Sequence, residues 1–170
     1  MADSIRASVL TVSDKGAAGE RKDVSGPLLA DRLRNLGAEI VHQAILPDER
    51  EEIAGRLRQL ADEQAVDLIV TTGGTGLTPR DVTPEATRAV IERETPGLAE
   101  LLRTEGYRQT PLAVLSRGVA GIRGATLIIN LPGSPRAVRE GMETLAPILP
   151  HALRMVRGRD TEHDLETHHA

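Results

Sequence analysis

The 170-residue sequence contains no cysteine, no phenylalanine and no tryptophan, and Tyr107 is its single tyrosine. Without cysteine, the chain has no disulfide, no thiol nucleophile and no thiolate metal site. Proteins that bind single-stranded nucleic acids stack bases on aromatic side chains, and this chain lacks such a platform. Leucine, isoleucine, valine and alanine must therefore fill the hydrophobic core.

Blocks of one charge and long apolar runs are also absent. The 21 basic and 25 acidic residues are interspersed and give a formal net charge of −4, so no basic block predicts a nucleic-acid partner. The start of the sequence lacks the basic region and apolar run of a signal peptide. No apolar run approaches the roughly 20 residues that cross a bilayer. These absences predict a soluble, cytoplasmic protein that binds neither nucleic acid nor membrane.

A chain of this length fits one domain, and it is long enough to bury roughly 70% of its unfolded surface. Neither a repeat nor a linker divides it. From Gly158 onward the sequence "GRDTEHDLETHHA" is polar throughout. We predict one domain over residues 1–157 and a polar C-terminal tail over residues 158–170.

Apolar and polar residues alternate along the chain in the pattern of an α/β protein. Short apolar runs predict strands at 5–13, 38–46, 67–72 and 125–132. Amphipathic segments predict helices over 25–37, 48–63 and 134–145, and two short helices that begin at Thr83-Pro84 and Thr95-Pro96. Strands that alternate with helices indicate βαβ units around a mainly parallel sheet.

Several residues mark the expected ends of these helices. Ser25 is a candidate N-cap, and Gly37 is a candidate C-terminal stop. Thr83 is expected to cap its helix from the position before Pro84, because proline suits the first helical position. Ser134 is the simplest N-cap of the last of these helices.

The loops after the predicted strands form the candidate site, because α/β sheets bind ligands beyond the carboxyl ends of their strands. These loops read "SDKGAAGE" (13–20), "LPDERE" (46–51), "GGTGLTPRD" (73–81) and "PGSP" (132–135). Three of them contain an aspartate, and two have glycines where the backbone can approach a ligand.

The glycine-rich loop directly follows a strand and reads Gly73-Gly74-Thr75-Gly76. Backbone without Cβ atoms can turn its N–H groups toward an anion. The loop lacks the lysine of a Walker A motif, and Pro79 stands where a dinucleotide fingerprint has its third glycine. The alternative is a glycine turn without a ligand. We favour a phosphate nest, because a turn does not need three glycines in four residues.

Two aspartates, Asp48 and Asp81, stand beside this loop in the predicted arrangement. Asp48 comes just before a helix with Glu51 three residues on, so it fits an N-cap as well as a metal ligand. Asp81 lies two residues before Thr83, the expected cap, and its carboxylate is therefore free for other work. A local Asx-type turn bond is the alternative for Asp81.

A second anion site is indicated where the last predicted strand meets its helix. Pro132 and Gly133 precede Ser134 and allow the first N–H groups of that helix to face a phosphate. Carboxylates repel phosphates unless a hard cation lies between them, and Mg²⁺ commonly binds one or two carboxylates together with substrate phosphates. With Asp48 and Asp81, the loops predict phosphoryl or nucleotidyl transfer with Mg²⁺.

The remaining basic side chains are interpreted without a functional role. Arg80, Arg117 and Arg123 are expected to be ordinary surface residues. The five histidines form no metal-binding motif. Three of them stand in the polar tail: His163, His168 and His169.

Taken together, the motifs resemble a known family. The stretches are "LTVSD" (10–14), "TTGGTGLTPRDVTPEAT" (71–87), "ERETPG" (92–97) and "LSRGVAGIRGATLIINLPGSP" (115–135). They are similar to molybdenum-cofactor biosynthesis proteins of the MogA and MoaB type, which are related to the molybdopterin-binding G domain of gephyrin. The resemblance runs from about Ile5 to about Val156.

This resemblance implies a three-layer αβα domain with a mainly parallel sheet and a homotrimeric assembly. The implied activity is that of a molybdopterin adenylyltransferase, which converts ATP and molybdopterin, with Mg²⁺, to adenylyl-molybdopterin and pyrophosphate. Insertion of molybdate would then require a separate protein.

The resemblance also assigns roles to individual residues. Asp48 and Asp81 match the catalytic acidic positions and would hold Mg²⁺. The positions that match the nucleotide and phosphate end are Ser13, Asp14, Gly73, Gly74, Thr75 and Gly76. The positions that match the molybdopterin site are Ser116, Asn130, Pro132, Gly133 and Ser134.

Two other functions are compatible with parts of the pattern. A molybdopterin carrier or scaffold of the same fold would bind the pterin without Mg²⁺ and consume no ATP. A dinucleotide-dependent oxidoreductase would fit the α/β pattern, but the missing third glycine and the missing acidic residue about 20 positions after a first-strand glycine loop count against it.

Overall fold

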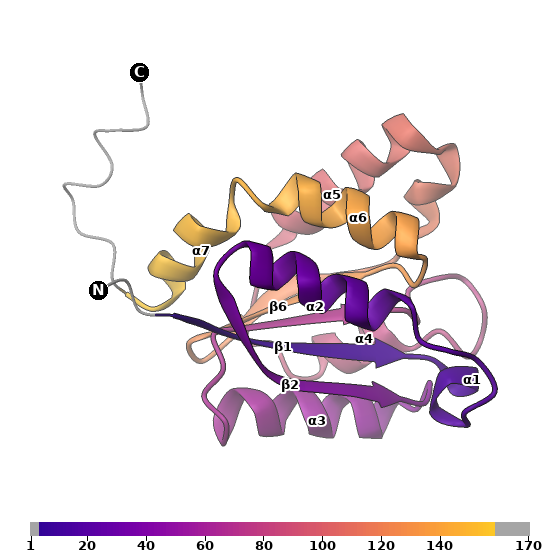
Figure 1. Cartoon of the computed structure of the whole chain (residues 1–170), viewed down its shortest axis with the longest axis horizontal. Helices are drawn as coiled ribbons and strands as arrows, with labels where there is room; N and C mark the ends of the chain where they lie inside the picture. Colours follow the sequence, from indigo (N-terminus) through magenta and orange to yellow (C-terminus); the bar gives the residue numbers. More distant parts are fainter. Residues whose placement is uncertain (1–3, 159–170) are drawn as a thin grey trace.

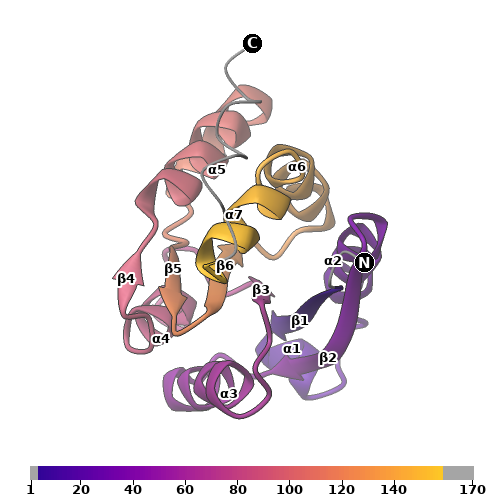
Figure 2. The same cartoon turned by 90° about the vertical axis from the view of Figure 1, so that its left-hand side faces the viewer.

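The computed structural model describes residues 4–158, and within them a six-stranded sheet lies between two layers of helices (Figures 1 and 2). The strands are β1 (Ile5–Val12), β2 (Ala38–Leu46), β3 (Leu68–Thr72), β4 (Arg93–Glu94), β5 (Ala120–Arg123) and β6 (Thr126–Leu131). The helices are α1 (Asp14–Ala17), α2 (Ser25–Asn35), α3 (Arg50–Asp62), α4 (Thr83–Arg88), α5 (Pro96–Gln109), α6 (Pro135–Leu145) and α7 (Leu149–Val156), with a 3₁₀ helix, η1 (Pro111–Leu115). Most of the predicted tail, including His163, His168 and His169, lies outside the described residues.

The strand order is β2-β1-β3-β6-β5-β4, and the first four of these strands are parallel. They are the four strands that the sequence predicts, so the mainly parallel sheet is confirmed. The order β2-β1-β3 is that of flavodoxin-like sheets and differs from the dinucleotide-binding order, which counts against the oxidoreductase hypothesis. In such sheets the ligand site lies where the strand order reverses, which here is between the parallel strands β1 and β3.

The sequence patterns miss the antiparallel edge of the sheet. Strand β5 pairs antiparallel with β6, and β4 pairs antiparallel with β5. These strands have four and two residues, which is too short for an alternating pattern to show. Helix α7 is missed as well, and α5 has 14 residues where a short helix is predicted.

Both faces of the central strands are buried, so two aliphatic cores replace the missing aromatic residues. Val9 and Ile129 belong to the core beneath α2, α6 and α7. Leu10 and Ile128 belong to the core beneath α3 and α4. Since successive residues of a strand point to opposite faces, neighbouring positions fill different cores, which explains the continuous apolar runs.

The ends of α2 show one correct and one wrong prediction. Gly37 follows the helix with a φ of +86°, as a glycine stop should. Ser25 is not the N-cap but the first residue of the helix. The Asp23 carboxylate accepts the Gly26 N–H at 2.9 Å instead, and the Ser25 hydroxyl donates to the Gly133 carbonyl at 2.7 Å. Ser25 therefore ties the start of α2 to the loop after β6.

Within residues 4–158, every helix is too short or too polar to cross a bilayer. The domain boundary after residue 157 stays a prediction, one residue beyond the end of α7.

Candidate active site

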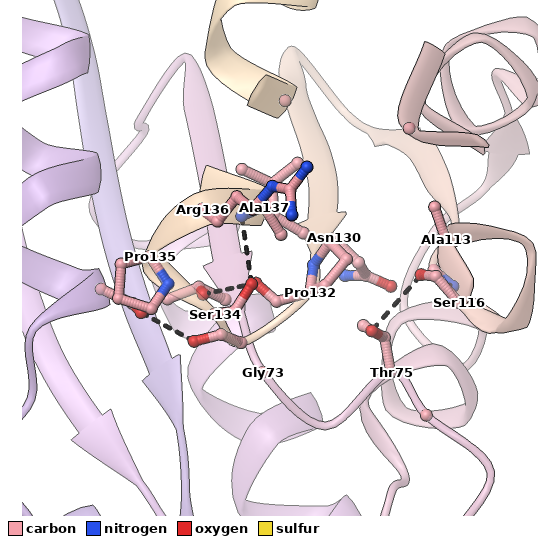
Figure 3. A pocket seen from close by; sticks show the side chains of 18 of the residues that line it. Gly73, Thr75, Ala113, Ser116, Asn130, Pro132, Ser134, Pro135, Arg136 and Ala137 are labelled. Carbon is pink, nitrogen blue, oxygen red and sulfur yellow. Dashed lines mark hydrogen bonds between the residues drawn. The ribbon is translucent and has the colours of Figure 1, made fainter. Parts of the chain in front are cut away.

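The carboxyl ends of β1, β3 and β6 open into a cleft of about 1320 Å³. Figure 3 shows residues that surround it from the loop after β3, from η1 and the segment that follows it, and from β6 and the start of α6. The predicted site residues that line it are Ser13, Asp48, Gly73, Gly74, Thr75, Gly76, Asp81, Ser116, Asn130, Pro132, Gly133 and Ser134. The remaining one, Asp14, contacts Asp48 beside the cleft. The four predicted loops therefore meet at one edge of the sheet.

Close backbone contacts explain Gly73 of the β3 loop and Gly133 of the β6 loop, and a positive φ explains Gly74. Gly73 has a φ of +101°, and a Cβ there would lie 2.2 Å from the carbonyl oxygen of Val12, the last residue of β1. A Cβ at Gly133 would lie 3.2 Å from the Gly73 Cα. The Gly73 N–H donates to the Leu131 carbonyl at 3.0 Å, and Gly74 has a φ of +68°. Side chains at these positions would push the three strand ends apart.

The Asp48 and Asp14 residues hold each other in place. The Asp48 carboxylate accepts the Asp14 N–H, and the Asp14 carboxylate accepts the Asp48 N–H, both at 2.9 Å. Glu49, not Asp48, occupies the N-cap position of α3, so the capping interpretation of Asp48 is wrong. Ser13 caps the short helix α1 through the Gly16 N–H at 3.0 Å.

Burial raises the pKa of the Asp48 carboxyl, and the bond from the Asp14 N–H offsets part of that rise. The negative charges of Asp14 and Asp81 raise it further. A cation beside Asp48 would relieve both the burial and the repulsion. The charges around Asp48 therefore favour a positively charged ligand.

Arg80 supplies the positive charge already present in this cluster. Its guanidinium donates to both oxygens of Asp14 at 3.0 Å and to Glu49 at 2.9 Å. The hydrogen bonds from Arg80 to Asp14 lower the pKa of the Asp14 carboxyl. Arg80 is exposed, as predicted, but it joins the loop after β3 to the loops after β1 and β2.

Asp81 makes the local turn that the sequence offers as an alternative. Its Oδ2 atom accepts the Thr78 N–H at 3.0 Å and the Thr78 hydroxyl at 2.8 Å. Thr83 does not cap α4 as predicted, because Val82 holds the N-cap position. The Thr83 hydroxyl instead donates to the Gly73 carbonyl at 3.0 Å.

The carboxylates of Asp48 and Asp81 nevertheless both lie against the glycine loop 73–76. A Cβ at Gly74 would be 3.1 Å from Asp48 Oδ1, and a Cβ at Gly76 would be 2.8 Å from Asp81 Oδ2. The residues of 4–158 contain no group of three or more acidic, histidine or cysteine side chains that could hold a metal ion. Two carboxylates suit Mg²⁺, which completes its coordination with phosphates and waters.

The residues on the β6 side are tightly bonded within the protein. Asn130 is only 3% exposed; its Oδ1 accepts the Val119 N–H at 3.1 Å, and its Nδ2 donates to Thr71 and Thr87 at 3.1 and 3.0 Å. The Ser116 hydroxyl donates to the Thr75 hydroxyl at 3.3 Å (Figure 3). Through these bonds, Asn130 holds the cleft wall at β6 in place.

The start of α6 confirms one predicted cap. The Ser134 hydroxyl accepts the Ala137 N–H at 3.1 Å, and Pro135 is the first helical residue (Figure 3). The Pro132 carbonyl accepts a bond from the Thr72 hydroxyl at 2.8 Å. The loop after β6 is therefore fixed to β3 on one side and begins α6 on the other.

Sequence reasoning misses the outer wall of the cleft. Apolar side chains from α5 and η1 line it, namely Leu101, Leu102, Leu112 and Leu115. Basic side chains line it too, namely Arg21, Lys22, Arg103 and Arg136. The charged run "ERKD" (20–23) in the loop after β1 could have indicated Arg21 and Lys22 as site residues. No local sequence pattern marks Arg103 or Arg136. Arg117 and Arg123, which do not line the cleft, are not ordinary surface residues. The Arg117 side chain donates to two backbone carbonyls and a carboxylate, and that of Arg123 donates to one carbonyl and a carboxylate.

Known proteins resemble this chain over most of its length. A family model described as a probable molybdopterin binding domain matches residues 8–151. The molybdopterin adenylyltransferase of Helicobacter pylori J99 is 41% identical over 157 residues, which cover 91% of this chain and 89% of that protein.

Two further relatives differ in how much of their length the chain covers. The molybdenum cofactor synthesis protein cinnamon of Drosophila melanogaster is 45% identical over 167 residues; these cover 98% of this chain but only 28% of that protein. The crystal structure of the molybdopterin biosynthesis enzyme MoaB from Thermus thermophilus is 54% identical and has a TM-score of 0.86, with 91% of this chain and 97% of that one covered.

The raised pKa of Asp48 predicts a pH-dependent effect of Asp48→Asn on stability. Because the folded state holds this proton more tightly than the unfolded state, ionised Asp48 destabilises the fold once the pH exceeds its raised pKa. In metal-free buffer, Asp48→Asn should increase the free energy of unfolding at pH 7. The gain should vanish as the pH falls below about 4, the ordinary pKa of aspartate.

Urea unfolding at several pH values measures this difference. Asp62→Asn is the matched control, because a hydrogen bond from Arg123 lowers the pKa of Asp62. Its substitution should reduce the free energy of unfolding at pH 7. A loss of stability in Asp48→Asn that is the same at every pH would contradict this account of Asp48.

Proposed function

We propose that this chain, which belongs to the family of probable molybdopterin-binding domains, is a molybdopterin adenylyltransferase of molybdenum-cofactor biosynthesis. In the proposed reaction, an oxygen of the terminal phosphate of molybdopterin attacks the α-phosphorus of ATP. The bond from the α-phosphorus to the oxygen that bridges it to the β-phosphorus breaks. The products are adenylyl-molybdopterin and pyrophosphate.

One observation carries the proposal: Asp48 and Asp81 lie against the same glycine loop, where the carboxyl ends of β1 and β3 meet. Their carboxylates come from different loops; burial raises the pKa of Asp48, and the charge of Asp81 adds to that rise. Asp48 and Asp81 would hold Mg²⁺, which would neutralise the charge on the ATP phosphates when bound. The role of the protein is then to position two phosphates and to stabilise the charge that develops between them.

The two substrates would occupy opposite ends of the cleft. Ser13, Asp14 and the loop 73–76 would hold the triphosphate end of ATP, with backbone N–H groups as donors. Ser116 and the segment 130–134 would hold molybdopterin. Asn130 would act there by supporting the wall, because its side-chain donors are already used within the protein.

The start of α6 would suit the terminal phosphate of molybdopterin. Helix α6 has 11 residues, and Ser134 and Pro135 at its N-terminus line the cleft. Backbone N–H groups at such a helix start favour negative charge. The apolar wall of α5 and η1 would pack against the flat pterin ring.

We also propose that the protein is a homotrimer in the cytoplasm and that a separate protein inserts molybdate. Two large apolar side chains outside the cleft lining are exposed near the end of α5 and in η1, namely Tyr107 and Val114. An exposed apolar cluster of this kind supports a contact between subunits. Light scattering should give the mass of three chains, and a monomer at micromolar concentration would contradict the assembly.

The activity test follows pyrophosphate and adenylylated product from ATP, Mg²⁺ and molybdopterin. Asp81→Asn should lower kcat by about 100-fold or more, because it weakens the proposed cation site. Its thermal midpoint and its affinity for molybdopterin should stay close to those of the unchanged protein, since asparagine can still accept the bonds from Thr78. Asp62→Asn is the control, because Asp62 does not line the cleft.

Two outcomes would overturn this assignment. If Asp81→Asn unfolds, Asp81 has a structural role. If the unchanged protein binds molybdopterin without Mg²⁺ and forms no product beside a working enzyme, the carrier or scaffold function replaces the enzymatic one.

A further inference from the structure

Arg117 joins the two sides of the cleft without lining it. Its own N–H donates to the Thr75 carbonyl at 2.8 Å. Its Nε donates to the Gly76 carbonyl at 2.8 Å, and its Nη2 donates to the Asp81 carbonyl at 2.8 Å. Its Nη1 pairs with Glu85 in α4. All three guanidinium nitrogens therefore have partners.

These contacts fix the two ends of one short loop. Gly76 and Asp81 begin and end the segment 76–81, and a single planar group bonds to both carbonyls. Inside the segment, the Asp81 N–H donates to the Thr78 carbonyl at 3.0 Å, and Thr78 donates to the Asp81 carboxylate. The loop is thus closed from within by Thr78 and clamped from outside by Arg117.

The segment that carries Arg117 is itself held in place. Arg103 of α5 donates to the carbonyls of Ser116 and Gly118, at 3.2 and 2.7 Å. These are the residues on either side of Arg117. Glu85 is ionised at neutral pH, because the Arg117 guanidinium holds the pKa of its carboxyl below the usual range. The backbone of the Arg117 segment is thus held by Arg103, and the Arg117 side chain is held by Gly76, Asp81 and Glu85. Arg117 therefore has a fixed position.

We propose that Arg117 is a positioning residue that holds the loop 76–81 so that the Asp81 carboxylate can share a cation with bound ATP. This inference rests on the proposed adenylyltransferase function. Arg117 does not line the cleft, although Ser116 and Gly118 do, so it acts through Asp81 rather than on the substrate. Lysine cannot replace it fully, because a single ammonium group lacks the forked donors that reach two carbonyls and a carboxylate together.

A double-mutant cycle on nucleotide binding tests this role without relying on turnover. Calorimetry measures the Kd of ATP with and without Mg²⁺ for the unchanged protein, Arg117→Lys, Asp81→Asn and the double variant. Arg117→Lys should weaken the Mg²⁺-dependent affinity by about tenfold, and by less than about twofold when Asp81 is already asparagine. Equal losses in both backgrounds would show that Arg117 does not act through Asp81.

Arg123→Lys is the matched control for a general loss of stability. Arg123 also donates to a carboxylate, that of Asp62, and to a carbonyl, that of Val90. None of these three residues lines the cleft. Arg123→Lys should lower the thermal midpoint but leave the Kd of Mg²⁺-ATP unchanged. If it weakens Mg²⁺-ATP as much as Arg117→Lys does, the positioning role is wrong.

A second variant keeps the test decisive if Arg117→Lys does not fold. Glu85→Gln removes the ion pair but leaves the two carbonyl bonds of Arg117 in place. It should weaken Mg²⁺-ATP by a smaller factor, and that loss should also disappear in the Asp81→Asn background. If the unchanged protein shows no Mg²⁺-dependent ATP binding, the proposed function itself fails, and the role of Arg117 fails with it.

Discussion

The contact between the backbones of Gly73 and Val12 is the constraint on which the site depends. It brings the carboxyl ends of β1 and β3 so close that any side chain at Gly73 would lie 2.2 Å from a carbonyl oxygen. Gly73 also bonds to β6 and accepts the Thr83 hydroxyl from α4. Four elements thus meet at one residue without a side chain. The position of the loop 73–76, and of the carboxylates beside it, follows from this junction.

The meeting of the loops also brings negatively charged side chains together. Bringing the loops together buries part of Asp48 and places it near Asp14 and Asp81; the burial and, to a lesser extent, these charges raise the pKa of Asp48. Arg80 offsets part of the repulsion by pairing with Asp14 and Glu49, while Asp48 and Asp81 have no basic hydrogen-bond partner within residues 4–158. Ionised Asp48 on the cleft wall reduces the stability of the fold, because its pKa is raised there. The proposed divalent cation, shared by Asp48 and Asp81, would offset that loss.

The sequence predicts most of the parallel sheet because buried strands leave a strong local signal. β1, β2, β3 and β6 stand out as apolar runs, and Ser134 is recognisable as a cap from the proline that follows it. β4 and β5 leave no such signal, since they are short and depend on pairing with a neighbouring strand: β5 pairs with β6, and β4 pairs with β5.

For the candidate site too, the sequence predicts one part and misses another. Motifs and strand ends predict that its loops converge, but they do not predict what each side chain does there. Arg117 contacts Gly76, Asp81 and Glu85, which are 41, 36 and 32 residues away in the sequence, so no local pattern could separate it from a surface arginine. Thr83 has the sequence context of a cap but bonds to Gly73 instead. Hydrogen bonds between distant segments decide these roles, and only the folded chain shows them.

The central claim is that Asp48 and Asp81 share one divalent cation with ATP. A crystal structure with Mg²⁺ and a non-hydrolysable ATP analogue tests it most directly. We predict one Mg²⁺ bound by both carboxylates and by the triphosphate, with the phosphates against residues 73–76. A nucleotide bound with its cation away from Asp48 and Asp81, or bound outside the cleft, would contradict the account.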